Sequence, residues 1–211
     1  MNKFNSTVVP QPRLIPLENV HEEMESRSPQ INQVLVNFMD ELDSKFNGKN
    51  IETNDLVELI YKYVDQAMSI ISPLTVCAKG CANCCRLNVS VSSVEAMYIQ
   101  HKTGIKFNKK AKELTPHIVK KTSKEFLSPC TFLNQETNSC SIYEYRPLSC
   151  RMFMTFDDPE LCESLGIEHK IFNSSGIPIF TKVLADIVMQ IRGKGGITFS
   201  VAEIRNLFKK V

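Results

Sequence analysis

Four thiols lie within nine residues in the stretch Cys77-Ala-Lys-Gly-Cys-Ala-Asn-Cys-Cys85 of this 211-residue chain. A hydrophobic core does not require cysteines at that density, because a buried cysteine packs only as a small apolar side chain. Thiolates are soft metal donors, and four of them satisfy a zinc ion or an iron–sulfur cluster. We therefore predict that this stretch binds metal and that the rest of the chain holds it in place.

Four further cysteines follow at wide intervals, and we predict that they complete the ligand set. The predicted metal ligands are Cys77, Cys81, Cys84, Cys85, Cys130, Cys140, Cys150 and Cys162. Spacing does not determine which of them act together, or whether they form one site or two. Because successive side chains of an extended segment point to opposite sides, Cys84 and Cys85 could face different sites, or one of them could remain unligated.

Arginines stand close to the thiols in the sequence. Arg86 and Arg151 each follow a cysteine directly, and Arg146 lies in the segment between Cys140 and Cys150. Nearby cations stabilise the negative charge of thiolates and raise the potential of a redox centre. We therefore predict that Arg86, Arg146 and Arg151 support the bound cofactor from outside the ligand shell; the alternative is that they are ordinary surface charges.

Composition places the chain among cytoplasmic proteins. It has no apolar run near the roughly 20 residues of a membrane-spanning helix and no apolar signal core at its start, so we expect no membrane association. In the reducing cytoplasm, a cysteine cluster is more often metal-binding or catalytic than disulfide-bonded. A net charge of only +2 argues against nucleic-acid binding. The partner that we expect is an unidentified protein or redox partner.

Apolar periodicity predicts a mainly α-helical single domain with a loop-rich cysteine cluster and one short β-hairpin. We divide it into an extended arm (1–16), a helical hairpin (17–72), the cysteine-cluster metal-binding region (73–165) and C-terminal helices packing on the same core (166–211). Ser28 and Pro29 predict the start of the first long helix, as its cap and its first residue. Thr53 or Asn54 is the expected cap of the second, which Ser72-Pro73 ends.

Shorter elements follow from local signals. Ser92 and Glu95 form a capping-box pattern that opens a helix, and Ser200 with Glu203 repeats that pattern near the end of the chain. Residues 131–133 and 141–143 flank a polar turn and predict the hairpin. We also expect helices over 109–121, from about 157, and over 180–191.

The cysteine pattern as a whole resembles the YkgJ-like family, over about residues 77–162. The resemblance rests on Cys-x3-Cys-x2-Cys-Cys-Arg at 77–86, on Cys-Thr-Phe-Leu at 130–133, on Cys-Ser-Ile-Tyr-Glu-Tyr-Arg-Pro-Leu-Ser-Cys-Arg at 140–151, and on Cys162. Members of that family are described as zinc- or iron-chelating, or as iron–sulfur cluster proteins. The resemblance implies metal binding by these cysteines and leaves the reaction open.

Three functions follow from these patterns. The first is an iron–sulfur protein, with a 4Fe–4S cluster in a redox or auxiliary role, because the uneven cysteine spacing differs from the paired spacing of zinc fingers. The second is an interaction module with a structural zinc site. The third is an enzyme in which one cysteine, such as Cys85, is an unligated nucleophile.

Overall fold

The computed structural model describes residues 16–46, 52–77, 80–111, 128–156, 162, 171–172 and 201–209. They form a mainly α-helical single domain with only short two-stranded sheets, as the sequence predicts. The long helices are α1 (Val20–Phe46) and α2 (Thr53–Ile71). The shorter elements are η1 (Leu17–Asn19), η2 (Ser72–Leu74), η3 (Asn83–Arg86), β1 (Ser90–Ser92), α3 (Ser93–Thr103), β2 (Leu133–Asn134), β3 (Ser139–Cys140), η4 (Tyr143–Tyr145), α5 (Leu148–Arg151), β4 (Met154–Thr155), β5 (Ile171–Phe172), β6 (Val201–Glu203) and α7 (Ile204–Leu207).

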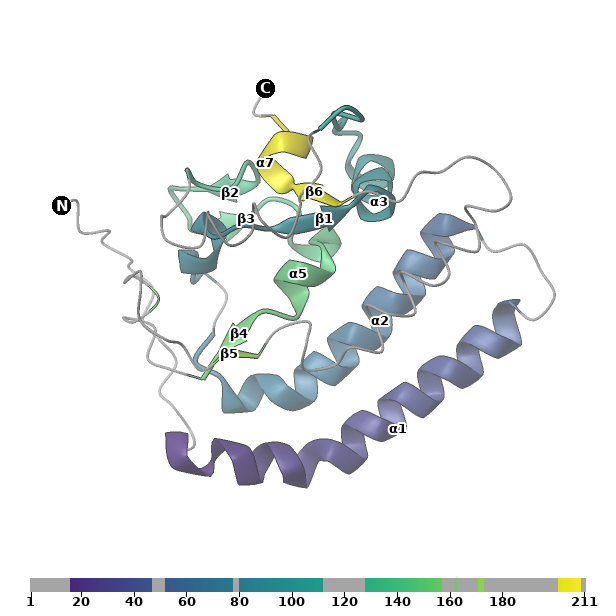
Figure 1. Ribbon diagram of the computed structural model, residues 1–211, viewed down its shortest axis with the longest axis vertical. Helices are drawn as coiled ribbons and strands as arrows, with labels where there is room; N and C mark the ends of the chain where they lie inside the picture. The colour runs from purple at the N-terminus through teal and green to yellow at the C-terminus, as the bar shows by residue number, and fades with distance from the viewer. Residues whose placement is uncertain are drawn as a thin grey trace.

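Helices α1 and α2 run antiparallel along one side of the molecule (Figure 1). Helix α1 begins at Val20, so the predicted start at Ser28 and Pro29 is wrong, and Pro29 lies inside the helix. The earlier turns form because Val20 is buried in the core of the hairpin and Met24 packs against it. The Ser28 hydroxyl donates to the Met24 carbonyl instead of capping a helix.

The core of the hairpin is apolar and continuous with part of the cysteine region. Phe38 on α1 and Leu56, Ile60 and Val64 on α2 are fully buried. Burial of such side chains stabilises the fold by about 1.5–3 kcal/mol each. Leu148 in α5 and Met152 just after it belong to the same cluster, so α5 packs directly against the helical hairpin.

The ends of α2 differ slightly from the prediction. Thr53 is its first residue, and the position before it is Glu52, which makes no side-chain cap. The predicted cap at Thr53 or Asn54 is therefore wrong by one or two residues. The helix ends at Ile71, and Pro73 lies in the following 3-10 turn, as predicted.

Helix α3 confirms the capping box. The Ser92 hydroxyl accepts from the Glu95 backbone N–H, and the Glu95 carboxylate accepts from the Ser92 N–H. Gly104 ends the helix with φ +73°, a left-handed conformation that glycine adopts without strain.

The second predicted capping box is wrong. Residues Val201–Glu203 form β6, which pairs antiparallel with β1 in the register Val91↔Ala202. Glu203 itself caps α7 by accepting from the Arg205 N–H. The C-terminal segment therefore reaches back to the start of α3 and ends in a single helical turn (Figure 1).

The predicted β-hairpin is present as β2 and β3, in the register Leu133↔Cys140, but its strands are shorter and lie closer to the turn than the predicted 131–133 and 141–143. A second two-stranded sheet pairs β4 with β5, in the register Thr155↔Ile171. Between these sheets, α5 lies near the middle of the molecule, between the helical hairpin and the β1–β6 pair (Figure 1).

Several expectations lie outside the described residues: the extended arm up to residue 15, the helix beyond residue 111, the helix start near 157 and the helix over 180–191. The division of the chain into regions stays a prediction. No described helix is both long and apolar enough to cross a membrane.

Candidate metal centre

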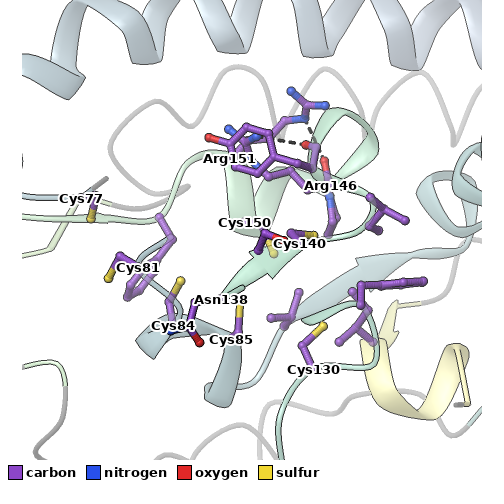
Figure 2. A pocket seen from close by; sticks show the side chains of 18 of the residues that line it. Cys77, Cys81, Cys84, Cys85, Cys130, Asn138, Cys140, Arg146, Cys150 and Arg151 are labelled. Atoms are coloured by element: carbon purple, nitrogen blue, oxygen red, sulfur yellow. Dashed lines mark hydrogen bonds between the residues drawn. The ribbon is translucent and has the colours of Figure 1, made fainter. Parts of the chain in front are cut away.

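Seven of the eight cysteines line one cavity of about 270 Å³. They come from separate stretches of the chain, and the seven are Cys77, Cys81, Cys84, Cys85, Cys130, Cys140 and Cys150. Figure 2 shows them spread across the cavity, from Cys77 at one side to Cys130 at the other. The eighth, Cys162, is half-buried and does not belong to the described lining.

Local structure fixes each thiol. Cys84 and Cys85 lie on η3, where the Cys85 N–H donates to the Ala82 carbonyl at 3.0 Å. Cys140 ends β3, and Cys150 lies in α5 with its N–H 2.9 Å from the Pro147 carbonyl. Proline at 147 fixes the direction of the chain at the start of that turn.

Cys77 is held from another direction. The Thr155 N–H in β4 donates to the Cys77 sulfur at 3.3 Å, and the Val76 N–H donates to the Thr155 carbonyl at 3.3 Å. Burial raises the pKa of the Cys77 thiol, and the Thr155 N–H opposes that rise by favouring the thiolate. Strand β4 therefore positions the first cysteine of the cluster.

The thiol pKa values follow burial and mutual proximity. Burial raises the pKa of Cys130 to about 11, and it also raises that of Cys140. Burial raises the pKa of Cys150 still further, and the neighbouring thiols of Cys130, Cys85 and Cys140 add to the rise. A bound cation reverses this effect, because a metal deprotonates the thiols that coordinate it.

Cys85 is the exception. The Cys84 thiol donates to the Cys85 sulfur, which lowers the pKa of Cys85 to about 7 and raises that of Cys84. The positive charges of Arg205 and Arg86 lower the pKa of Cys85 further. Cys85 is therefore the thiol of this pair that ionises first.

The three predicted arginines occupy different positions. Arg146 lines the cavity, stacks 3.8 Å over the Tyr143 ring, and its charge lowers the pKa of Cys140 and Cys150. Arg86 acts electrostatically on Cys85. Their role toward a bound cofactor stays a prediction.

Arg151 has a different set of partners. Its guanidinium donates to the Arg146 carbonyl at 2.8 Å, to the Glu144 carbonyl and to the Asp65 carboxylate at 2.5 Å. It also stacks 4.1 Å over the Tyr61 ring. These bonds anchor the segment between Cys140 and Cys150 to α2, so Arg151 acts on the thiols through the backbone.

The sequence analysis did not identify Glu95 and Arg205 as residues that support the site. Glu95 is buried and accepts from the Leu148 N–H at 2.8 Å and the Tyr61 hydroxyl at 3.1 Å, so it ties the start of α5 to α2 and α3. Its capping-box pattern predicted only the local bond to Ser92. Arg205 is 120 residues from Cys85, whose carbonyl it contacts at 2.6 Å, and no local pattern indicates that contact.

The donor set decides which ligands fit. None of the described residues that line the cavity is Asp, Glu or His. Thiolate-only sites suit zinc, copper(I) and iron–sulfur clusters, whereas magnesium, calcium and manganese require oxygen donors. The residues present therefore fit a zinc or iron–sulfur centre.

The thiols line the cavity without meeting at one point. Among the residues that the structure describes, no three Cys, His, Asp or Glu side chains are grouped closely enough to hold an ion. All eight cysteines are described and none is disulfide-bonded. Binding must therefore draw the thiols inward, which couples metal binding to the folding of this region.

Fold and site together define a helical protein with a thiol-lined centre suited to a soft metal. Comparison with known families makes this more specific: residues 76–170 match the model of the CxxCxxCC family, described as "Putative zinc- or iron-chelating domain". This part of the chain is therefore similar to a cysteine-cluster family, in agreement with the resemblance drawn from the cysteine pattern. Neither a curated protein nor a solved structure matches the chain.

Proposed function

We propose that this protein holds an iron–sulfur cluster of the 4Fe–4S type through its cysteine thiolates, in a redox or auxiliary role. The observation that carries the proposal is the convergence of seven thiols on one cavity that lacks carboxylate and imidazole groups among its described lining residues. Its volume of about 270 Å³ far exceeds the roughly 10–15 Å³ that is enough to hold one water molecule. A structural zinc ion in a closed tetrahedral site leaves no such space.

The cations around the cavity support the same proposal. A thiolate cluster carries net negative charge, and nearby positive charges or hydrogen bonds raise its reduction potential. Arg146, Arg86 and Arg205 all act on thiols of the cavity. A redox role requires a partner protein that exchanges electrons with the cluster. A reducing compartment such as the cytoplasm suits eight cysteines that form no disulfide bond.

Zinc is the alternative metal, because four thiolates also satisfy its tetrahedral preference and the family description names both metals. In that case the protein is a structural interaction module. The third alternative, an enzyme with a cysteine nucleophile, draws on the lowered pKa of Cys85.

Anaerobic purification of the full chain tests the choice of metal. An iron–sulfur protein is brown, with broad visible absorption and equal amounts of iron and acid-labile sulfide. A colourless protein with stoichiometric zinc contradicts the cluster and supports the alternative. A protein that binds neither metal after anaerobic reconstitution with either one contradicts the proposed function altogether.

A further inference from the structure

We propose that the cavity is divided into an inner set of four thiols, which together bind one metal centre, and an outer set of three. The inner set comprises Cys85, Cys130, Cys140 and Cys150. The outer set comprises Cys77, Cys81 and Cys84. This assignment rests on the proposed metal-binding function and adds to it the identity of the ligands.

Backbone hydrogen bonds join the segments that carry the inner set. The Cys130 N–H donates to the Cys85 carbonyl at 2.9 Å, which ties the loop before β2 to η3. The Leu133↔Cys140 register of the β2–β3 hairpin brings Cys140 back beside the same loop. These bonds fix the relative positions of three of the four inner cysteines before any metal binds.

Helix α5 brings Cys150 to the same place. The Ser149 hydroxyl donates to the Ser90 carbonyl at 2.5 Å, and the Leu148 N–H donates to the buried Glu95 carboxylate. Both bonds hold α5 against the β1–α3 segment. Cys150 lines the same cavity as Cys85, Cys130 and Cys140, and all four thiols are in contact with the same apolar cluster.

The apolar surroundings separate the two sets. A second hydrophobic cluster, distinct from that of the hairpin, is centred on residues such as Ile99, Ile204 and Phe208. All four inner cysteines belong to this cluster or pack against it, whereas the three outer ones do not. Thiolates in apolar surroundings are costly unless a cation neutralises them, so the inner set needs a metal more than the outer set does.

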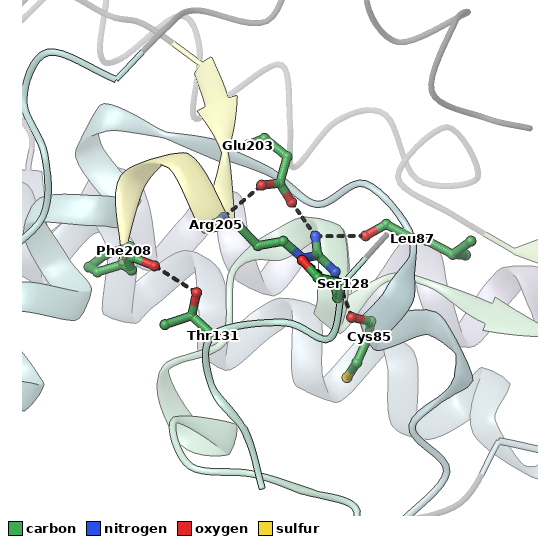
Figure 3. Close-up of polar contacts among 7 residues, drawn as sticks. All are labelled: Cys85, Leu87, Ser128, Thr131, Glu203, Arg205 and Phe208. Carbon is green, nitrogen blue, oxygen red and sulfur yellow. Dashed lines mark hydrogen bonds and ion pairs between the residues drawn. The ribbon is translucent and has the colours of Figure 1, made fainter. Parts of the chain in front are cut away.

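Arg205 of the C-terminal segment connects the backbone segments that carry two of the inner cysteines, and we call this set of contacts the Arg205 clasp (Figure 3). The Arg205 guanidinium donates to the carbonyls of Cys85 at 2.6 Å and Ser128 at 2.7 Å, so it links the backbones that carry Cys85 and Cys130. It also donates to the Leu87 carbonyl at 3.2 Å and pairs with Glu203. This clasp lies beyond residues 76–170, the part that matches the family.

The outer set is attached differently. Cys77 bonds to β4 through the Thr155 N–H, on the side of the cavity away from Cys130 (Figure 2). Cys84 is exposed, although it is adjacent to the half-buried Cys85. Although the Cys84 thiol donates to the Cys85 sulfur, only Cys85 packs against the second hydrophobic cluster. We therefore assign Cys85 to the inner set and Cys84 to the outer set.

Thiol protection in the unmodified chain tests this assignment. Metal-free protein, reduced and kept anaerobic, is loaded with one equivalent of Co²⁺ or Zn²⁺ and treated with iodoacetamide, and each cysteine is then quantified by mass spectrometry. We expect the four inner cysteines to be protected by the metal and the three outer ones to be modified. Protection of Cys77 or Cys81 in place of any inner cysteine would overturn the assignment.

Two neighbouring substitutions provide a matched pair. Cys85→Ser removes an inner ligand and should weaken Co²⁺ binding by more than about 100-fold, whereas Cys84→Ser should change it by less than about threefold. Equal effects of the two substitutions, or a larger effect at Cys84, overturn the assignment. If Cys85→Ser lowers the yield of folded protein, the protection pattern of the unmodified chain decides alone.

The two proposals fail in different ways. Unmodified protein that binds no Co²⁺, Zn²⁺ or iron contradicts the proposed function. Unmodified protein that binds metal with a protection pattern across both sets contradicts only the division into inner and outer thiols.

Discussion

The helical hairpin and the cysteine region of this protein are stabilised by different interactions. Helices α1 and α2 span 27 and 19 residues and share a core of fully buried apolar side chains. The elements that carry Cys85, Cys140 and Cys150 span only two to four residues each. They are joined by hydrogen bonds between groups far apart in the sequence, such as Arg205 and the Cys85 carbonyl.

The difference indicates which part of the fold depends on metal. Single turns and two-residue strands are unstable in isolation, because each ordered residue loses conformational entropy that few contacts offset. The hairpin offsets that entropy with apolar burial along its whole length. We therefore expect the hairpin to keep its structure without metal, and the cysteine region to need metal for its full stability.

Metal removal gives the largest predicted effect. Loss of the centre should remove on the order of 10 kcal/mol of binding free energy from the cysteine region. Hydrogen exchange of the metal-free, reduced protein should show lost protection over residues 80–111 and 128–156 and retained protection in α1 and α2. Loss of protection in both regions together would contradict the independence of the hairpin.

Phe38→Ala tests the other side of the comparison. Phe38 is fully buried, and its ring lies 5.5 Å from that of Tyr63 between the two helices. Its truncation leaves a cavity and should lower the free energy of unfolding by about 4 kcal/mol. Urea denaturation measures this loss, and metal content of the folded protein should stay unchanged.

The control for this substitution lies on the same helix. Val36 is 51% exposed, so Val36→Ala should change the free energy of unfolding by less than about 0.5 kcal/mol. A variant of Phe38 that loses its metal while the hairpin stays folded would show that the core shared with Leu148 and Met152 couples the hairpin to the metal centre.

Arg205→Gln should weaken the cysteine region alone. The substitution removes charge-assisted hydrogen bonds to the half-buried carbonyls of Cys85 and Leu87, which costs about 2 kcal/mol. It also removes a positive charge beside Cys85. We expect weaker metal binding and, for an iron–sulfur centre, a lower reduction potential. Arg205→Lys keeps the charge and should restore the potential more fully than the affinity, because lysine lacks the planar fork of donors.

Arg27→Gln is the matched control for Arg205. Arg27 also pairs with a carboxylate, that of Glu23, but one turn away on α1. Such a pair contributes roughly 0.3–0.5 kcal/mol, so metal affinity and potential should stay at the values of the unmodified protein. Equal effects of the two substitutions would show that Arg205 acts only through overall stability.

The sequence predicts those features of this fold that depend on neighbouring residues. The capping box of Ser92 and Glu95 and the β2–β3 hairpin both follow from residues close in the chain. The start of α1 does not, because buried contacts of Val20 outweigh the preference of Pro29 for a first turn. The same limit applies at Glu203, where pairing with β1 determines a strand instead of a helical turn.

The site, too, is predictable from the sequence only where it depends on residue types and local spacing. The cysteine pattern identifies the thiols that line the cavity, because ligands of a soft metal must be chemically distinctive. It does not divide the thiols into sets, since that division depends on contacts such as the bond from the Cys130 N–H to the Cys85 carbonyl. Local sequence patterns do not predict the contact of Arg205 with η3, because that contact depends on the pairing of β1 with β6.

The smallest predicted effect concerns Glu41, whose contacts make the stability of the helical hairpin depend on pH. Glu41 on α1 accepts hydrogen bonds from Lys62 at 2.5 Å and Tyr63 at 2.7 Å on α2, and pairs with Lys45. The hydrogen bonds from Lys45, Lys62 and Tyr63 lower the pKa of Glu41 from 4.5 to about 2. Because this pKa is depressed in the folded state, the stabilisation is complete above the ordinary value of 4.5 and disappears as the pH falls toward 2.

Glu41→Gln should therefore lower the free energy of unfolding by about 1 kcal/mol at pH 7, because both lysines are half exposed and solvent screens their charges. The difference from the unmodified protein should shrink as the pH falls below 4.5, as urea denaturation of the two proteins at several pH values can measure. Glu25→Gln, at an exposed position of α1 where the carboxylate pairs with His21 one turn away, should show no such trend. A difference that grows in acid would mean that the carboxylate of Glu41 destabilises the hairpin, contrary to the contacts that link α1 and α2.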